Sequence, residues 1–162
     1  AVLLGVAAGI LFLGPALVLS TFSHELLMRV MGSEPEKQAT IEILEKSVGA
    51  GQRICFGLVA IGLVPFVEEI LFRGILYPLL KQQGRPIVAI VASSVLFAAI
   101  HLNLMIFIPL VILALLLVAL YEFTDTLLAP IAAHAVFNAA NFFLLIYQPK
   151  LQQIWELLRE RI

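Results

Sequence analysis

The sequence predicts an all-α protein, a polytopic bundle of transmembrane helices, and three observations support this prediction. Hydrophobic residues make up 62% of the 162 residues and charged residues only 13%, and the mean hydropathy is +1.06. A single soluble core of this size cannot bury so much apolar surface. The apolar runs reach the ~20 residues that cross a bilayer. We therefore expect at least five membrane helices and one interfacial amphipathic segment.

Residues 1–53 are expected to form a first membrane helix followed by a polar connection. The apolar stretch over about 1–21 has no basic leader, which favours a membrane helix over a cleaved signal. The connection over 22–52 is rich in charged residues. Its apolar residues recur at helical spacing and predict the interfacial segment: Ile41, Ile43, Leu44 and Val48.

Residues 54–147 are expected to form the helical core of the protein. The predicted helices cover 54–80, 87–102, 104–123 and 127–147, with short polar turns between them. Pro65 interrupts the first of these helices, so that one bent helix and two helical pieces both remain open. After Pro149, residues 148–162 are expected to form an amphipathic tail.

Charge and cysteine content narrow the possible partners. The formal net charge is −1, which gives no indication of a nucleic-acid partner. Cys55 is the single cysteine, which excludes an internal disulfide framework and a cysteine-rich zinc site. The high hydrophobic content instead predicts that the lipid bilayer is the first partner.

Two carboxylates and a guanidinium interrupt the apolar run over 54–80. Glu69 and Arg73 lie four residues apart and can pair on a helix, whereas Glu68 points about 100° away from Glu69 and has no cation nearby in the sequence. Charged groups at membrane depth are costly and indicate a function. We expect Glu69 to be structural and Glu68 to be free for chemistry.

Two further helices carry polar side chains that could meet Glu68. Phe97 and His101 lie four apart on the helix expected over 87–102, and His134 and Asn138 lie four apart on the helix over 127–147. Polar side chains in membrane helices face the bundle interior, so we expect these groups to converge. Polar packing between helices, without any catalysis, is the alternative.

Such a cluster could hydrolyse a peptide bond. Hydrolysis by a buried glutamate needs a water against the carboxylate, a second group that orients it, and donors for the oxyanion. Glu68 with His101 can supply the first two, and His134 with Asn138 can supply the donors. A two-histidine, one-carboxylate zinc site made by Glu68, His101 and His134 is also open.

Other hydrolytic mechanisms lack their residues. Asp125 is the single aspartate, which excludes an intramembrane protease with two aspartates. The segment from His24 to Met28 resembles a zinc helix but lacks its second histidine. Ser94 lies about 10 Å along the helix from His101, too far for a direct hydrogen bond.

The three motifs, Glu68-Glu69-x-x-x-Arg73, Phe97-x-x-x-His101 and His134-x-x-x-Asn138, resemble those of a known family. This is the CAAX prenyl protease and bacteriocin-processing family (CPBP, or Abi) of intramembrane glutamate endopeptidases. The resemblance implies that Glu68 and His101 activate water, that His134 and Asn138 form the oxyanion hole, and that no cofactor is needed.

The resemblance also implies a substrate class and a location. Members of the eukaryotic branch cleave prenylated CAAX proteins, so the expected partner is a peptide or protein substrate, prenylated or not. The expected location is a prokaryotic plasma membrane or an organelle membrane, crossed several times. A non-catalytic membrane module for binding or immunity is the alternative from another class, and a zinc-dependent protease is the alternative within the same class.

Overall fold

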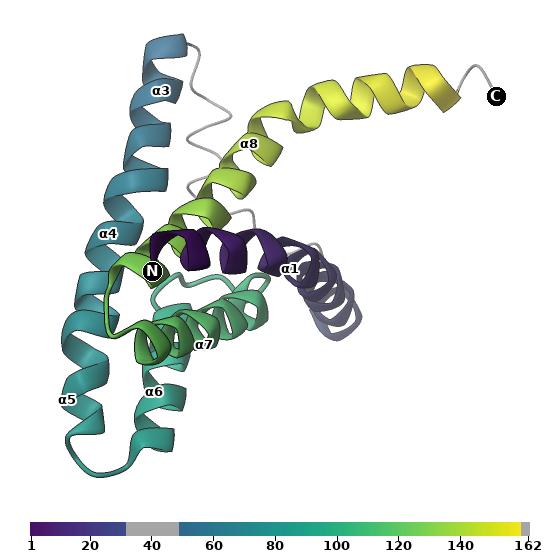
Figure 1. The fold of residues 1–162 in the computed structure, drawn as a ribbon. Coiled ribbons are helices and arrows are strands. Elements are labelled where there is room, and N and C mark those ends of the chain that lie inside the picture. The colour runs from purple at the N-terminus through teal and green to yellow at the C-terminus, as the bar shows by residue number, and fades with distance from the viewer. Residues whose placement is uncertain (32–48, 160–162) are drawn as a thin grey trace.

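The computed structural model describes residues 1–31 and 49–159, and these residues form helices joined by short turns (Figure 1). The elements are α1 (Val2–Met31), α3 (Ala50–Leu58), η1 (Val59–Leu63), α4 (Val64–Glu69), η2 (Ile70–Leu76), α5 (Tyr77–Lys81), α6 (Pro86–Ala99), α7 (Phe107–Thr124) and α8 (Leu128–Arg159). The prediction of an all-α helical bundle is confirmed. The amphipathic segment expected around Ile41 to Val48 lies outside the described residues.

Four stretches of the described chain are long and apolar enough to cross a membrane: Val2–Val30, Gly51–Lys81, Phe107–Thr124 and Leu128–Tyr147. The helix expected over 87–102 is α6, which has 14 residues. At 1.5 Å per residue α6 is about 21 Å long, shorter than the ~30 Å hydrocarbon core. It is apolar and packs against α5 and α7.

The helix that carries the glutamates is one continuous rod rather than two pieces, as Figure 1 shows for α3 to α5. Two π-helical segments, η1 and η2, are built into it, and each ends just before a proline. Val64 donates its N–H to Val59 O before Pro65, and Tyr77 donates its N–H to Phe72 O before Pro78.

Proline explains this pattern. A proline in a helix has no N–H to donate, and its ring clashes with the carbonyl four residues back. Widening the preceding turn to i→i+5 bonding relieves that clash without breaking the rod, and such π segments occur often at functional sites. The two segments enclose α4, which carries Glu68 and Glu69.

Three helix ends differ from the prediction. Helix α1 continues to Met31 instead of ending near residue 21, because residues such as Leu26 and Leu27 favour helix despite the polar neighbours. Helix α6 ends at Ala99, since the chain turns there and Leu102 adopts a positive φ of 50°. Helix α8 runs through the tail to Arg159 with Pro149 inside it, and in Figure 1 its C-terminal part extends away from the other helices.

Close packing of α1 against α8 depends on glycine. A Cβ on Gly5 would overlap the carbonyl oxygen of Ala129, and a Cβ on Gly9 would lie 2.8 Å from Ala133 O. Small residues four apart let membrane helices approach closely, where van der Waals packing replaces the missing hydrophobic drive. The contact places α8, and with it His134, firmly against α1.

The core lies where α6, α7 and α8 meet the glutamate-bearing rod. Phe97, Leu113, Leu117 and Ala133 are fully buried at its centre, and Phe72, at 8% exposed, packs with them. Phe72 and Phe97 pack edge to face, with ring centroids 5.1 Å apart. This apolar centre surrounds the polar groups described next.

Candidate active site

Glu68 and Glu69 are neighbours at the end of α4, but they meet different surroundings. The side chain of Glu69 is completely buried, whereas that of Glu68 is 18% exposed. One oxygen of each carboxylate, Oε2 in both residues, is buried and has no hydrogen-bond partner among the described residues. The two carboxylates are thus separated into an enclosed one and an accessible one.

Arg73 holds the enclosed carboxylate. Its Nη1 donates to Glu69 Oε1 at 2.8 Å, and its Nη2 donates to the carbonyl oxygen of Ala114 at 2.9 Å. The guanidinium carbon lies 4.8 Å from the centroid of the Phe97 ring, a cation–π distance. The pairing of Glu69 with Arg73 that the spacing indicates is present, and it links the rod to both α6 and α7.

His134 joins α8 to the same carboxylate. Its Nδ1 lies 2.9 Å from Glu69 Oε1, and its Nε2 lies 3.7 Å from Glu68 Oε2. An ionised carboxylate can only accept, so Nδ1 donates to Glu69. The neutral ring then carries its lone pair on Nε2, the nitrogen that faces Glu68.

His101 approaches Glu68 from the other side. It lies in the turn after α6 instead of within the helix, and its Nδ1 donates to the carbonyl oxygen of Phe97 at 2.8 Å. Its Nε2 lies 4.0 Å from Glu68 Oε1. The Phe97 ring lies beside both histidines, with centroids 5.2 Å from His101 and 5.6 Å from His134.

Asn138, like Arg73, makes a contact that the sequence does not suggest. Its Nδ2 donates to the carbonyl oxygen of Ala60 in η1 at 2.9 Å. Asn141, on the same stripe of α8, donates to Phe137 O of its own helix. Asn138 thus forms a hydrogen bond to the helix that carries the glutamates, whereas Asn141 bonds within α8.

The two serines of α6 differ as well. Ser93 donates to Ile90 O at 3.2 Å, the back-bonding expected of a hydroxyl in a membrane helix. The hydroxyl oxygen of Ser94 is buried without a hydrogen-bond partner in the part of the chain that the structure describes.

Over residues 1–31 and 49–159, no group of three or more His, Cys, Asp or Glu side chains that could hold a metal ion is found. The donors nearest to such a set are Glu68, His101 and His134, at the separations given above.

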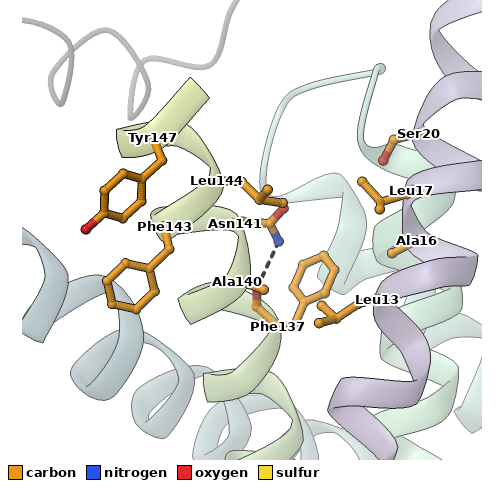
Figure 2. A pocket seen from close by; sticks show the side chains of 10 residues that line it. All are labelled: Leu13, Ala16, Leu17, Ser20, Phe137, Ala140, Asn141, Phe143, Leu144 and Tyr147. Carbon is orange, nitrogen blue, oxygen red and sulfur yellow. Dashed lines mark hydrogen bonds between the residues drawn. The ribbon is translucent and has the colours of Figure 1, made fainter. Parts of the chain in front are cut away.

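An apolar cavity of about 530 Å³ lies beside the site, between α1 and α8 (Figure 2). Leu13 and Leu17 line it from α1, and Phe137 and Leu144 line it from α8. Its polar lining groups belong to Ser20, Asn141 and Tyr147. Phe137 and Asn141 lie three and seven residues after His134, so the cavity borders the stripe of α8 that carries His134.

Sequence reasoning missed two anchors of the site. Ala60 and Ala114 take part through backbone carbonyls, which no residue type reveals. The prolines at positions 65 and 78 could have indicated the π segments, because each proline removes a backbone donor from a membrane helix.

The family model described as type II CAAX prenyl endopeptidase Rce1-like matches residues 50–140, more than half of the chain and the whole stretch from α3 to the Asn138 turn of α8. No curated protein and no solved structure matches the chain.

The family implies protease activity, a peptide substrate and a lipid environment. Together with the four spanning stretches it makes this an integral, multi-pass membrane protein. By its motifs, its bundle and the match over residues 50–140, the chain belongs to the Rce1-like family of type II CAAX prenyl endopeptidases.

Proposed function

We propose that the protein is an intramembrane endopeptidase in which Glu68 and His101 activate a water that attacks the scissile peptide bond. One observation carries the proposal. The Glu68 carboxylate lies between the Nε2 atoms of His101 and His134, at 4.0 and 3.7 Å, while the Nδ1 of each ring is engaged elsewhere.

The positions of the hydrogen-bond donors and acceptors around Glu68 favour a bound water there. In their neutral forms both rings turn a lone pair towards an acceptor, and two acceptors repel unless a donor lies between them. Both separations exceed direct hydrogen-bond length, so a bridging water can donate one hydrogen to the carboxylate and one to an imidazole. A water held in this way is poised to lose a proton to Glu68.

The reaction follows in two steps. In the first, the water oxygen forms a bond to the carbonyl carbon of the peptide while one water proton passes to the Glu68 carboxylate, giving a tetrahedral oxyanion. In the second, the C–N bond breaks and the proton on Glu68 passes to the leaving nitrogen, giving a carboxylic acid and an amine. His101 orients the water throughout, and Glu68 ends ionised as it began.

His134 and Asn138 are proposed to bind the oxyanion. His134 donates from Nε2 when its ring is protonated, and the Glu69 carboxylate on Nδ1 stabilises that imidazolium. Arg73 donates to the same oxygen of Glu69 and compensates its charge. The Asn138 amide has two hydrogens, of which one is donated to Ala60 O and the other remains for the oxyanion.

The proposed substrate is a peptide that carries a prenyl group, and the cavity between α1 and α8 supports this choice. Its volume of about 530 Å³ lies within the ~300–1,000 Å³ of ligand pockets. Ala140→Trp would fill the cavity, and we expect it to raise KM for a prenylated peptide at least tenfold. The same peptide without the prenyl group serves as the control, and an equal change for both would refute the assignment.

Cleavage by the Glu68→Gln variant in detergent tests the catalytic proposal. Gln keeps the shape of the side chain but cannot accept the proton, so we expect kcat to fall by about 10³-fold, within the range of general-base catalysis. Glu122→Gln, which alters an exposed carboxylate paired with Lys81, should cleave normally. Full biological activity of Glu68→Gln and His101→Ala would favour a binding or immunity module.

Metal dependence is tested separately. The proposal is a metal-free mechanism, and a zinc site on Glu68, His101 and His134 is the second candidate because both Nε2 atoms face the carboxylate. Stoichiometric zinc in the purified protein, together with loss of cleavage on chelation, would favour zinc.

A further inference from the structure

Asn138 makes a hydrogen bond that its proposed part in the oxyanion hole does not require. Its Nδ2 donates to the carbonyl oxygen of Ala60 at 2.9 Å, across the contact between α8 and η1. A carbonyl in the middle of a helix normally accepts an N–H of its own helix. The reason for this bond lies in the local backbone of the rod.

Pro65 leaves Ala60 O without a helical donor. In α-helical bonding the N–H of Val64 would donate to Ala60 O, but in η1 it donates to Val59 O. In π-helical bonding the donor to Ala60 O would be the N–H of residue 65, which a proline does not have. A carbonyl without a donor is costly at membrane depth, and the Asn138 amide supplies the missing donor to the partly buried Ala60 O.

The bond lies close to the reacting groups. Pro65 precedes Glu68 by three residues, and α4 carries no other break between them. One turn before Asn138 on α8, His134 bonds Glu69 at 2.9 Å. Helix α8 therefore holds the rod at two points, one at the π segment before the glutamates and one at the second glutamate.

We propose that Asn138 is a positioning residue that replaces the backbone donor lost at Pro65 and thereby fixes η1 and the Glu68 side chain against α8. Its consequence for catalysis rests on the proposed function, but the contact itself does not. The need for Asn138 at this carbonyl exists because residue 65 is proline. Removing the proline should therefore remove part of the need for the asparagine.

A double-mutant cycle of Asn138→Ala and Pro65→Ala tests this dependence, with kcat, KM and amide hydrogen exchange of residues 59–69 as readouts. In Pro65→Ala, residue 65 regains an N–H, so the helix can satisfy Ala60 O in either α or π bonding. Asn141→Ala is the matched control for hydrogen exchange alone, since Asn141 bonds Phe137 O of its own helix and also lines the cavity proposed to bind substrate. Exchange is measured on the full chain in detergent.

We expect Asn138→Ala to speed exchange over residues 59–69 by about 5- to 100-fold, the range for a carbonyl that loses its donor out of contact with water. Asn141→Ala should change it less than twofold. In the Pro65→Ala background, the effect of Asn138→Ala on exchange should shrink to below threefold, and part of the lost kcat should return with KM little changed. If Pro65→Ala does not fold, the comparison of Asn138→Ala with Asn141→Ala still decides whether the bond protects η1.

Two outcomes overturn the inference. If Asn138→Ala leaves exchange over residues 59–69 unchanged, or speeds it equally in both backgrounds, Asn138 does not replace the donor lost at Pro65. A kcat that falls equally in both backgrounds, with exchange unaffected, would leave Asn138 in the oxyanion hole alone. If instead the exchange effects are coupled but no variant or wild-type protein cleaves peptide, the positioning role survives and the proposed function fails.

Discussion

Replacing Arg73 with methionine should destabilise the bundle more than any exposed charge deletion. The side chains of Arg73 and Glu69 are 1% and 0% exposed, and their atoms lie 2.8 Å apart. Met fills similar volume but leaves the Glu69 carboxylate with His134 as its one remaining hydrogen-bond partner among the described residues. Ala114 O also loses the donor that links the rod to α7.

The expected loss in the free energy of unfolding follows from the burial of the ion pair. Breaking a buried ion pair by removing one partner costs about 3–5 kcal/mol, because the remaining charge stays buried without compensation. That range corresponds to roughly 10²- to 10⁴-fold in the folding equilibrium. Adding Glu69→Gln to Arg73→Met should recover more than half of the loss, because the remaining buried group is then neutral.

Reversible unfolding in mixed detergent micelles measures these free energies. Lys81→Met is the matched control: its pair with Glu122 is shorter still, at 2.6 Å, but the two side chains are 43% and 39% exposed. Exposed pairs contribute about 0–1 kcal/mol. If Arg73→Met costs no more than Lys81→Met, or if Glu69→Gln deepens the loss, the buried pair does not anchor the site as argued.

Three further predictions test the surroundings of the site. Gly9→Leu should push α8 away from α1 at Ala133 and lower kcat at least tenfold, whereas Gly14→Leu, which has nothing within 4 Å of its Cβ position, should not; equal effects in a cleavage assay would contradict the close packing. Phe97→Ala, at a fully buried ring, should cost about 3–5 kcal/mol in the same unfolding assay; a cost below ~1 kcal/mol would mean that the ring does not support the histidines. Chelators should leave the rate of peptide cleavage unchanged, and a loss that added zinc reverses would refute the metal-free mechanism.

The spacing and length of apolar and charged residues within single helices predicted the buried ion pair and the spanning helices. The four-residue separation of Glu69 and Arg73 places them on one face of a helix, and they form the buried pair that the periodicity indicates. Apolar runs of membrane length likewise predicted the spanning helices, because length and composition dominate in lipid.

Contacts between distant segments could not be predicted in the same way. The bonds from Arg73 to Ala114 O and from Asn138 to Ala60 O end on backbone carbonyls, which every residue has. Lys81 has no acidic residue in its own loop, and it pairs with Glu122, 41 residues away. These contacts depend on how the helices cross, which local periodicity does not specify.

Helix ends were predicted less well than helix positions. His101 was expected within a helix over 87–102, but α6 ends at Ala99 and His101 caps the helix through Phe97 O. The apolar residues after Ala99 gave no stop signal, and the turn depends on the positive φ of Leu102, which leucine rarely adopts.

Oxygen tracing tests the central claim, that Glu68 acts on water and not directly on the peptide. In a single turnover in H₂¹⁸O, the account predicts one ¹⁸O in the new carboxylate of the peptide product and none in the enzyme fragment that contains Glu68, both read by mass spectrometry. Appearance of ¹⁸O in the Glu68 side chain would show a covalent acyl-glutamate intermediate and would contradict the account.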